Sequence, residues 1–323
     1  MRVIRNRPAE APVEGSQREV GTHAPAGAAV AVGNFDGVHR GHLAVIDRCR
    51  QLATAGQAIA MVTFEPLPLA FFRPAQAPAR LTTVFQKLRL LRAAGVDITW
   101  LMRFDGRFAS LTAREFAERV LVSGLGARQV VVGADFRFGR GREGDVATLA
   151  TLGDEFGFGV HVEPAVLCDG ERISSSGIRQ HLAAGEFNQA AALLGRPFRM
   201  EGHVVRGAGL GRTLGYPTAN LRIRAEPSPL GGVLAAFARI ADGPWLPAVT
   251  NLGRRPAVGG GEPLLEVHFF DLDEDFYGQR LEVQFVAKLR DELDFGNLGA
   301  LTAQMKRDEQ AARRCLEQVE LPR

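Results

Sequence analysis

The stretch that decides the fold of the first half of the chain reads Gly33-Asn34-Phe35-Asp36-Gly37-Val38-His39-Arg40-Gly41-His42. Before it, the short apolar run of residues 27–32 predicts a buried strand. After it, Leu43, Val45, Ile46 and Leu52 recur at roughly helical spacing and predict a helix. In this order of strand, glycine-containing turn and helix, the unpaired N–H groups of the helix start point at whatever lies above the strand end. The stretch therefore predicts a phosphate-binding site.

Two histidines of this stretch are candidates for chemistry. His39 and His42 are three residues apart, so they lie on one face of the first helical turn. There they can donate hydrogen bonds to phosphate oxygens as negative charge builds up, and Gly41 between them leaves room for a nucleotide. The alternatives are a metal-binding pair and two solvated surface histidines. A metal site needs further ligands nearby, and only Asp36 and Asp47 are available.

The composition bounds the class of protein. A length of 323 residues predicts two domains, and 46% hydrophobic with 23% charged residues is typical of a soluble protein. The net charge of +3 gives no reason to expect a nucleic-acid partner, and no apolar run is long enough to span a membrane. Only three of the 39 basic residues are lysines, and none follows a glycine, so the P-loop motif of many kinases is absent.

The cysteines and the N-terminal segment suggest a location. Cys49, Cys168 and Cys315 are isolated in the sequence and form neither a disulfide framework nor a zinc motif, which favours a reducing, cytoplasmic compartment. Residues 1–26 are rich in Pro, Ala, Arg and Glu and lack the apolar core of a signal peptide. We expect them to form a flexible N-terminal extension.

Strands and helices alternate through the first half. Apolar runs predict further strands at 58–64, 98–102 and 129–132, and helical spacing predicts helices at 81–94, 112–121 and 186–194. This alternation predicts a parallel sheet covered on both faces, with its ligand site at the carboxyl ends of the strands. His39, His42, Pro66 and Asp135 all fall at those ends. Because Gly195 and Pro197 close the last helix, the predicted domains are 27–195 and 196–323.

A run of hydroxyl side chains precedes another predicted helix. Ser174, Ser175 and Ser176 can cap the helix and bind an anion, and Arg179 lies on its first turn. The alternative is an ordinary serine cap.

The second half has a different pattern. Residues 198–205, 233–240, 264–270 and 281–286 are predicted strands with little helix between them, which favours an antiparallel sheet or barrel. Residues 297–319 carry apolar side chains at helical spacing and predict a terminal helix packed on it.

A glycine-rich segment lies between the first two of these strands. Gly207 and Gly209 let backbone N–H groups wrap a phosphate chain, and Arg212 adds positive charge. Thr218 and Asn220 are two residues apart in an extended segment and face the same way, so their oxygens can bind Mg²⁺. The alternative is a glycine-rich hairpin with a proline turn.

One carboxylate stands out in the third of these strands. Glu266 points away from its neighbours Leu265 and Val267, and a carboxylate in an apolar strand is costly unless it has a role. It is therefore a candidate general base. The alternative is a solvated outer face of the sheet, which the same alternation would produce.

Six motifs in order resemble the bacterial bifunctional riboflavin kinase/FMN adenylyltransferase (FAD synthetase) family. The resemblance covers residues from about 28 to 315. It rests on Gly33–His42, Thr63-Phe-Glu-Pro66, Gly133-Ala-Asp-Phe-Arg-Phe-Gly139, Ile173-Ser-Ser-Ser176 with Arg179, Leu214-Gly-Tyr-Pro-Thr-Ala-Asn220, and Leu265-Glu-Val-His268.

The resemblance implies a fold, two reactions and a set of site residues. The fold is an α/β Rossmann-like nucleotidyltransferase domain with a parallel sheet, followed by an antiparallel β-barrel kinase domain with a terminal helix. Riboflavin and ATP would give FMN in the barrel, and FMN and ATP would give FAD and pyrophosphate in the first domain. Small molecules are then the expected partners, with Mg²⁺ as cofactor.

The resemblance also implies roles for individual residues. In the first domain, the ATP phosphates would be bound by His39, His42, Ser174, Ser175 and Arg179, and the same ATP by Gly33, Phe35, Asp36 and Gly41. In the barrel, the ATP of the kinase would be bound by Gly207, Gly209 and Arg212, Mg²⁺ by Thr218 and Asn220, and Glu266 would be the base that deprotonates the ribityl 5′-hydroxyl. Flavin would be bound by Asp135 and Arg290.

The chain departs from the family pattern at Leu67, Leu234 and Ala257. None of them is a predicted metal ligand or base. Three alternatives stay open: a class I aminoacyl-tRNA synthetase, an adenylyltransferase with a silent barrel, and a non-enzymatic flavin or nucleotide sensor. The lack of a lysine near Ser174–Arg179 argues against the first, and the retained histidines and Glu266 argue against the last.

Overall fold

The structure is a computed structural model that describes residues 1–5, 26–207, 210–222, 228–253, 264–272 and 274–322. The chain forms two compact units. The first unit comprises Met1–Pro78 and Val84–Ser174, and the second comprises Ala79–Thr83 and Ser175–Arg323. Helices α8 (Ser175–Ala184) and α9 (Phe187–Leu194) thus group with the second unit, whereas the predicted boundary at residue 195 assigned them to the first domain.

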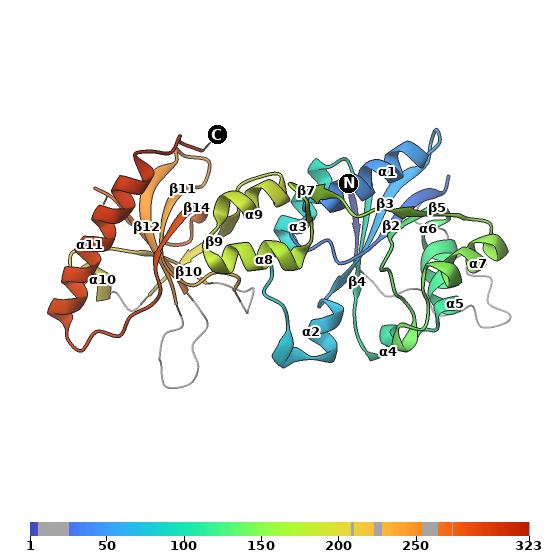
Figure 1. Cartoon of the computed structure of the whole chain (residues 1–323), viewed down its shortest axis with the longest axis horizontal. Coiled ribbons are helices and arrows are strands. Elements are labelled where there is room, and N and C mark those ends of the chain that lie inside the picture. Colours follow the sequence, from blue (N-terminus) through green and yellow to red (C-terminus); the bar gives the residue numbers. More distant parts are fainter. Residues whose placement is uncertain (6–25, 208–209, 223–227, 254–263, 273, 323) are drawn as a thin grey trace. The chain divides into compact units, whose positions relative to one another are not determined.

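The first unit is built on a six-stranded parallel sheet of strand order β1-β4-β3-β2-β5-β6, as the alternation of strands and helices predicted (Figure 1). The strands are β1 (Arg2–Ile4), β2 (Ala28–Val32), β3 (Ala58–Glu65), β4 (Ile98–Arg103), β5 (Ala127–Gly133) and β6 (Gly159–Glu163), with a small hairpin of β7 (Leu167–Cys168) and β8 (Glu171–Arg172). The helices are α1 (Arg40–Leu52), α2 (Pro68–Phe72), α3 (Val84–Ala93), α4 (Gly106–Ala109), α5 (Ala113–Phe116), α6 (Ser123–Leu125) and α7 (Val146–Phe156), with short 3₁₀ turns at Pro74–Gln76 and Arg140–Arg142 and a π-helical segment at Ala117–Val122.

The central strands are buried on both faces, which explains their continuous apolar sequence. All five residues of β2 are buried, and alternate side chains enter two different cores. Val30 packs with Val62 and Trp100 on one face, whereas Ala29 and Ala31 join the core beneath α1 on the other. The carboxyl end of β2 therefore emerges between two packed layers, where the Gly33–His42 turn begins.

The prediction of a flexible extension over residues 1–26 is wrong for its first residues. Arg2–Ile4 form β1, which pairs in parallel with the edge of β4, and Ile4 is buried. Three residues are too few for a periodic pattern, so the sequence offered no local signal. Residues 6–25 lie outside the described part of the chain.

The second unit contains a closed antiparallel barrel of order β10-β13-β12-β11-β14-β9, which confirms the predicted barrel. Helix α11 packs on its outer face over Ala235, Phe237 and Phe270. The strands are β9 (Arg199–Val205), β10 (Ala219–Arg222), β11 (Gly232–Ile240), β12 (Leu246–Gly253), β13 (Leu264–Phe269) and β14 (Arg280–Arg290), and the helices are α8 (Ser175–Ala184), α9 (Phe187–Leu194), α10 (Leu210–Thr213) and α11 (Leu298–Leu316).

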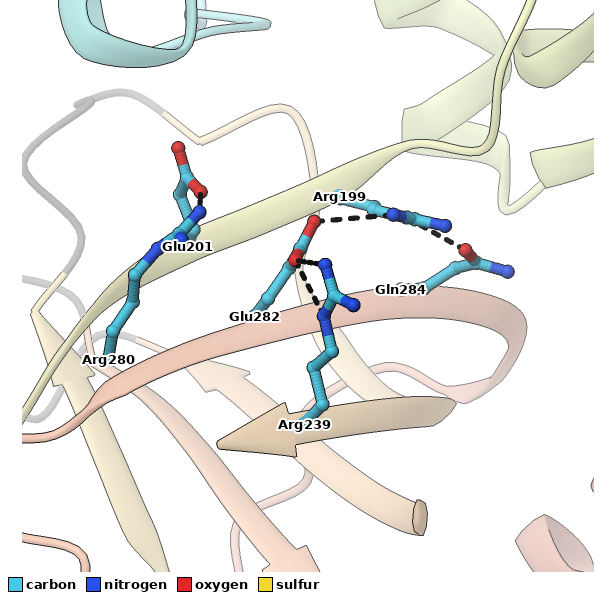
Figure 2. Close-up of polar contacts among 6 residues, drawn as sticks. All are labelled: Arg199, Glu201, Arg239, Arg280, Glu282 and Gln284. Carbon is cyan, nitrogen blue, oxygen red and sulfur yellow. Dashed lines mark hydrogen bonds and ion pairs between the residues drawn. The ribbon is translucent and has the colours of Figure 1, made fainter. Parts of the chain in front are cut away.

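Ion pairs link three neighbouring strands of the barrel, β9, β14 and β11 (Figure 2). Glu282 on β14 accepts hydrogen bonds from Arg199 on β9 and from Arg239 on β11, and only 5% of its side chain is exposed. Arg280 pairs with Glu201. No helix in the described part of the chain is long and apolar enough to cross a membrane.

Candidate functional site

The turn between β2 and α1 is held by a reciprocal cap of its two histidines. His39 is the N-cap of α1, and its Nδ1 accepts a hydrogen bond from the backbone N–H of His42 at 3.3 Å. The Nδ1 of His42 accepts from the backbone N–H of His39 at the same distance. The rings stack with centroids 3.6 Å apart and planes 16° apart. The two histidines therefore lie together at the helix start, as predicted.

This cap determines the tautomer of both rings. A ring nitrogen that accepts a hydrogen bond carries no proton, so the proton of each neutral imidazole is assigned to Nε2. Each ring then offers one Nε2–H donor beside the N-terminus of α1, where anions are favoured. His39 is buried and His42 is half-buried. The pair can thus donate hydrogen bonds to developing negative charge.

The backbone of the turn is strained and firmly anchored. Phe35 and Val38 have φ angles of +47° and +41°, a region that β-branched and bulky residues rarely adopt. Both side chains are buried in the core beneath α1, against Ile46 and Cys49. Such strain persists only where the surroundings enforce it, and it concentrates at functional sites.

The remaining residues assigned to this turn pack closely against it. The N–H of Gly33 donates to the carbonyl of Val62 on β3, and Asp36 is buried. A Cβ on Gly41 would lie 3.2 Å from the His39 ring and 3.6 Å from the carbonyl oxygen of Ile173. Gly41 is therefore needed for this packing as well as for the predicted nucleotide. The same contact brings the residue before Ser174 against the turn.

Three further predicted residues of the adenylyltransferase have identifiable surroundings. Asp135 is exposed after β5 and pairs with Arg172 at 2.9 Å. Ser175 begins α8, and Arg179 on the same helix donates through Nε to the backbone carbonyl of Ala79. One donor of the Arg179 guanidinium thus supports the chain within the second unit.

The barrel brings Thr218, Asn220 and Glu266 together across two strands. Asn220 on β10 is the register partner of Glu266 on β13, so their side chains share a face. The amide nitrogen of Asn220 donates to the carbonyl of Thr218 at 3.2 Å. Its Oδ1 is buried and has no hydrogen-bond partner in the described part of the chain. Glu266 is half-buried, between Leu265 and Val267, which are fully buried on the other face.

A hollow open to solvent lies beside Thr218 and Asn220. Gly207, Thr218 and Asn220 line it together with the carboxylates of Glu274 and Asp275. Gly207 lies so close to Asn220 that a Cβ there would come within 2.5 Å of the amide nitrogen. No group of three or more His, Cys, Asp or Glu side chains in the described ranges could hold a metal ion by itself.

The structure describes the other predicted barrel residues to different extents. Arg290 is bound to Asp308 on α11 through Nε and Nη2, the shortest distance being 2.6 Å. Arg212 belongs to α10, but its side chain is not described. Gly209 lies outside the described residues, and so does Ala257, one of the three departures from the family pattern. Leu67 and Leu234, the other two departures, are buried.

Two features near the first site were not predicted. Lys87 on α3 is 1% exposed and contacts the Gly33–His42 turn. Helical spacing could have revealed it, because Lys87 lies on the same face as Leu88 and Leu91. The second is a chain of contacting aromatic rings at the ends of β3 and β4, of which Phe72 is 61% exposed. Its rings are Phe64, Phe71, Phe72, Phe104 and Phe108.

Comparison with known proteins assigns both units. Residues 22–177 match the family model described as FAD synthetase, and residues 194–316 match that described as riboflavin kinase. The chain is 44% identical over 288 residues to the bifunctional riboflavin kinase/FMN adenylyltransferase of Escherichia coli strain K12, covering 89% of this chain and 92% of that protein. The chain belongs to the bifunctional riboflavin kinase/FMN adenylyltransferase family. This assignment excludes the aminoacyl-tRNA synthetase alternative.

Other members of the bifunctional riboflavin kinase/FMN adenylyltransferase family are equally similar. The protein of Pseudomonas fluorescens is 45% identical over 289 residues, covering 89% of this chain and 92% of its own length. Among solved structures, one from Streptococcus pneumoniae described as a macrolide-efflux protein has a TM-score of 0.76 and 30% identity. It covers 97% of this chain and 99% of its own, so the fold is shared along nearly the whole length.

Proposed function

We propose that this chain makes FMN from riboflavin and then FAD from FMN, using one ATP in each step. The family membership and the order of the two matched regions support both transferase activities. The observation that carries the site assignment is the reciprocal histidine cap, because it brings two Nε2–H groups together at the start of α1. We assign FMN adenylylation to the first domain, up to residue 195, and riboflavin phosphorylation to the barrel from residue 196.

In the adenylyl transfer, a phosphate oxygen of FMN attacks the α-phosphorus of ATP. The new P–O bond joins FMN to AMP, and the bond to the β-phosphate breaks to release pyrophosphate. FMN already supplies the nucleophile, so the protein has to position two phosphates and stabilise the extra charge. We assign that stabilisation to the Nε2–H groups of His39 and His42. Ser174, Ser175 and Arg179 are assigned to the phosphates, and Gly33, Phe35, Asp36 and Gly41 to the nucleotide.

The flavin of this reaction needs a flat apolar surface. The ring chain that contains Phe71 and Phe72 lies after β3 and β4, at the carboxyl edge of the sheet where ligands bind in such folds. Stacking on exposed Phe72 suits the isoalloxazine ring. We assign Asp135, beyond the end of β5, to the same flavin.

In the kinase reaction, Glu266 accepts the proton of the ribityl 5′-hydroxyl while that oxygen attacks the γ-phosphorus of ATP and ADP leaves. We assign Gly207, Gly209 and Arg212 to this ATP and Arg290 to the flavin. Arg290 would contact the flavin either with its hydrogen bonds to Asp308 intact or after they have broken.

The residues present fit Mg²⁺. Asn220 Oδ1 is a buried oxygen without a partner in the described chain, and it lines one cavity with Thr218 and the carboxylates of Glu274 and Asp275. Oxygen ligands of this kind, completed by ATP phosphates, suit a hard cation. Thr218 and Asn220 would hold the ion, which when bound supplies positive charge to the phosphates of ATP.

A cytoplasmic location is the compartment we infer, since all three cysteines are free thiols. Small molecules are the partners that the two reactions require. The deciding experiment is chromatography of flavins after incubation of the purified protein with riboflavin, ATP and Mg²⁺. FMN followed by FAD is the expected result, and removal of Mg²⁺ with a chelator should stop FMN formation. FAD formed only from added FMN would mean that the barrel is silent, and absence of both products would refute the proposal.

A further inference from the structure

A buried lysine touches the turn that carries the histidines. Lys87 on α3 is 1% exposed, and its Nζ donates to the carbonyl oxygen of Asn34 at 2.8 Å and to Thr63 Oγ1 at 3.3 Å. An ammonium group is costly to bury, and a Leu or Met would fill the same space without that cost. Packing alone therefore does not account for a lysine at this position.

Thr63 joins the lysine in a hydrogen-bond network. It is fully buried near the end of β3, and its hydroxyl donates to the same Asn34 carbonyl at 3.0 Å. Asn34 therefore receives two hydrogen bonds on one oxygen, one of them from a charged donor. Helix α3, strand β3 and the turn are joined at this single carbonyl. Hydrogen bonds from charged donors are the strong ones, and they are stronger in a buried site.

The Asn34 carbonyl lies next to the strained part of the turn. Asn34 directly precedes Phe35, the first of the two non-glycine residues with positive φ in the turn, and Val38, the second, directly precedes His39. A strained segment relaxes unless its neighbours fix it. If the Asn34 peptide rotated, the change would pass along the turn to the N-cap, where the reciprocal histidine bonds are already long at 3.3 Å.

We propose that Lys87 is a positioning residue for adenylyl transfer, which holds the Asn34 carbonyl and thereby fixes His39 and His42 as Nε2–H donors. This inference rests on the proposed function of the first unit. It predicts an effect on the chemical step rather than on nucleotide affinity, because Lys87 acts on the geometry of the donors. A displacement of catalytic groups by about 1 Å can reduce a rate about 100-fold.

The test compares Lys87→Met with Arg89→Met in the full-length protein. Arg89 lies two residues away on the same helix and is exposed, so it controls for loss of a cation on α3. For Lys87→Met we expect kcat for FAD formation from FMN to fall about 100-fold, with KM for ATP changed less than about 3-fold. Arg89→Met should match the wild type. Riboflavin phosphorylation should be unchanged in both variants and serves as the internal control.

A spectroscopic measurement separates positioning from stability. In ¹⁵N-labelled protein, the ring nitrogens of His39 and His42 should report a single Nε2–H tautomer in the wild type and a mixture in Lys87→Met. An unchanged kcat with a lower unfolding temperature would overturn the proposal, as would a change in KM alone. Wild-type protein that makes no FAD from FMN would instead refute the proposed function, and the tautomer comparison would still test the role of Lys87.

A second pair of variants covers the case in which Lys87→Met does not fold. Thr63→Val removes the hydroxyl of the network with little change of shape, whereas Thr63→Ser retains it. We expect kcat for FAD formation to be about 10-fold lower in Thr63→Val than in Thr63→Ser. Equal rates would overturn the proposal.

Discussion

The two units are stabilised in different ways. In the first unit, the histidine turn rests on an apolar base in which Phe35 and Val38 pack against Ile46 and Cys49. In the second, ion pairs join the strands β9, β14 and β11, with Glu282 between Arg199 and Arg239 (Figure 2).

The two arginines of this ion-pair network also contact an aromatic ring. The guanidinium carbons of Arg199 and Arg239 lie 4.8 and 4.6 Å from the ring centre of Trp245, which is buried. Packing of apolar side chains is insensitive to salt, whereas ion pairs and cation–π contacts weaken as charges are screened or removed. The comparison teaches that the turn of the first site rests mainly on packed apolar side chains, with one buried lysine contact, whereas ion pairs and cation–π contacts link strands of the barrel. The predictions below test that difference.

The largest expected effect is a reciprocal loss of the two activities. His42→Ala removes one Nε2–H donor and one half of the cap, so FAD formation should fall at least about 1,000-fold while FMN formation is spared. Glu266→Ala removes the proposed base and should do the reverse. Chromatography of flavins measures both products in one assay. FAD synthesis near the wild-type rate in His42→Ala would show that the first site is wrongly assigned.

Next in size is the effect of removing the buried amide oxygen of the barrel. Asn220→Leu should lower the rate of FMN formation about 100-fold, because the proposed Mg²⁺ ligand is lost. Its unfolding free energy should fall by only about 1 kcal/mol, because the variant loses the bond of Nδ2 to the Thr218 carbonyl whereas Oδ1 has no partner in the described chain to lose. Initial rates over a range of Mg²⁺ concentrations check the first point, and urea unfolding checks the second. FAD formation from FMN is the control and should not change, and an undiminished kinase rate would contradict the assignment.

The contribution of the ion-pair network of the barrel can be tested by changing one residue, Glu282. Glu282→Gln keeps the shape but removes the carboxylate charge that Arg199 and Arg239 share. Because Glu282 is buried and the arginines are partly exposed, we expect the barrel to lose about 2–3 kcal/mol of unfolding free energy. Hydrogen exchange resolved by mass spectrometry reports the two units separately.

The matched control for that experiment is Glu155→Gln in the first unit, whose ion pair with Arg114 is exposed. It should leave hydrogen exchange unchanged. A loss of protection in the barrel no larger than that of the control would show that the network contributes little, and the contrast between the units would fail.

The smallest expected effect concerns Cys49, which is buried in the apolar core beneath α1. Burial, with a smaller contribution from Glu163, raises the pKa of the Cys49 thiol from 9.0 to about 12. Between these values the unfolded chain loses a proton that the folded chain keeps, so this contribution to stability is full below pH 9 and is lost as the pH rises toward 12. Cys49→Ala should cost about 1 kcal/mol at pH 7.

The same variant should lose stability less steeply than the wild type between pH 9 and 10.5. Urea unfolding of both proteins at pH 7, 9 and 10.5 measures the difference. Parallel loss of stability in the two proteins would show that Cys49 is not held in the neutral form by burial.

Much of the fold could be predicted because apolar runs mark buried strands directly. The runs at 58–64 and 98–102 became β3 and β4 almost unchanged. Strand β12 was missed because Pro247 and Asn251 interrupt its pattern, and β10 because it has only four residues. Short or interrupted strands acquire their conformation from partners far away in the sequence, which a local pattern cannot report.

The candidate sites were predictable to the extent that their chemistry is local. His39 and His42 lie on one helical turn, so their spacing alone placed them together. The pairing of Asn220 with Glu266 depends on the register of two distant strands, although each residue was a candidate by itself. The bond between Arg290 and Asp308 joins a strand to a helix 18 residues later, and no local signal announces it.

Strand β1 has a consequence for handling the protein. Its three residues cover the edge of β4, and Arg2 is already paired with Ile98. Deleting residues 1–5 would uncover the edge of β4 at Ile98–Trp100, and an uncovered strand edge is a template for association between copies. A purification tag fused before Met1 would begin one residue from the sheet. The start of the chain is therefore a poor place for a tag, although its sequence has the composition of a dispensable leader.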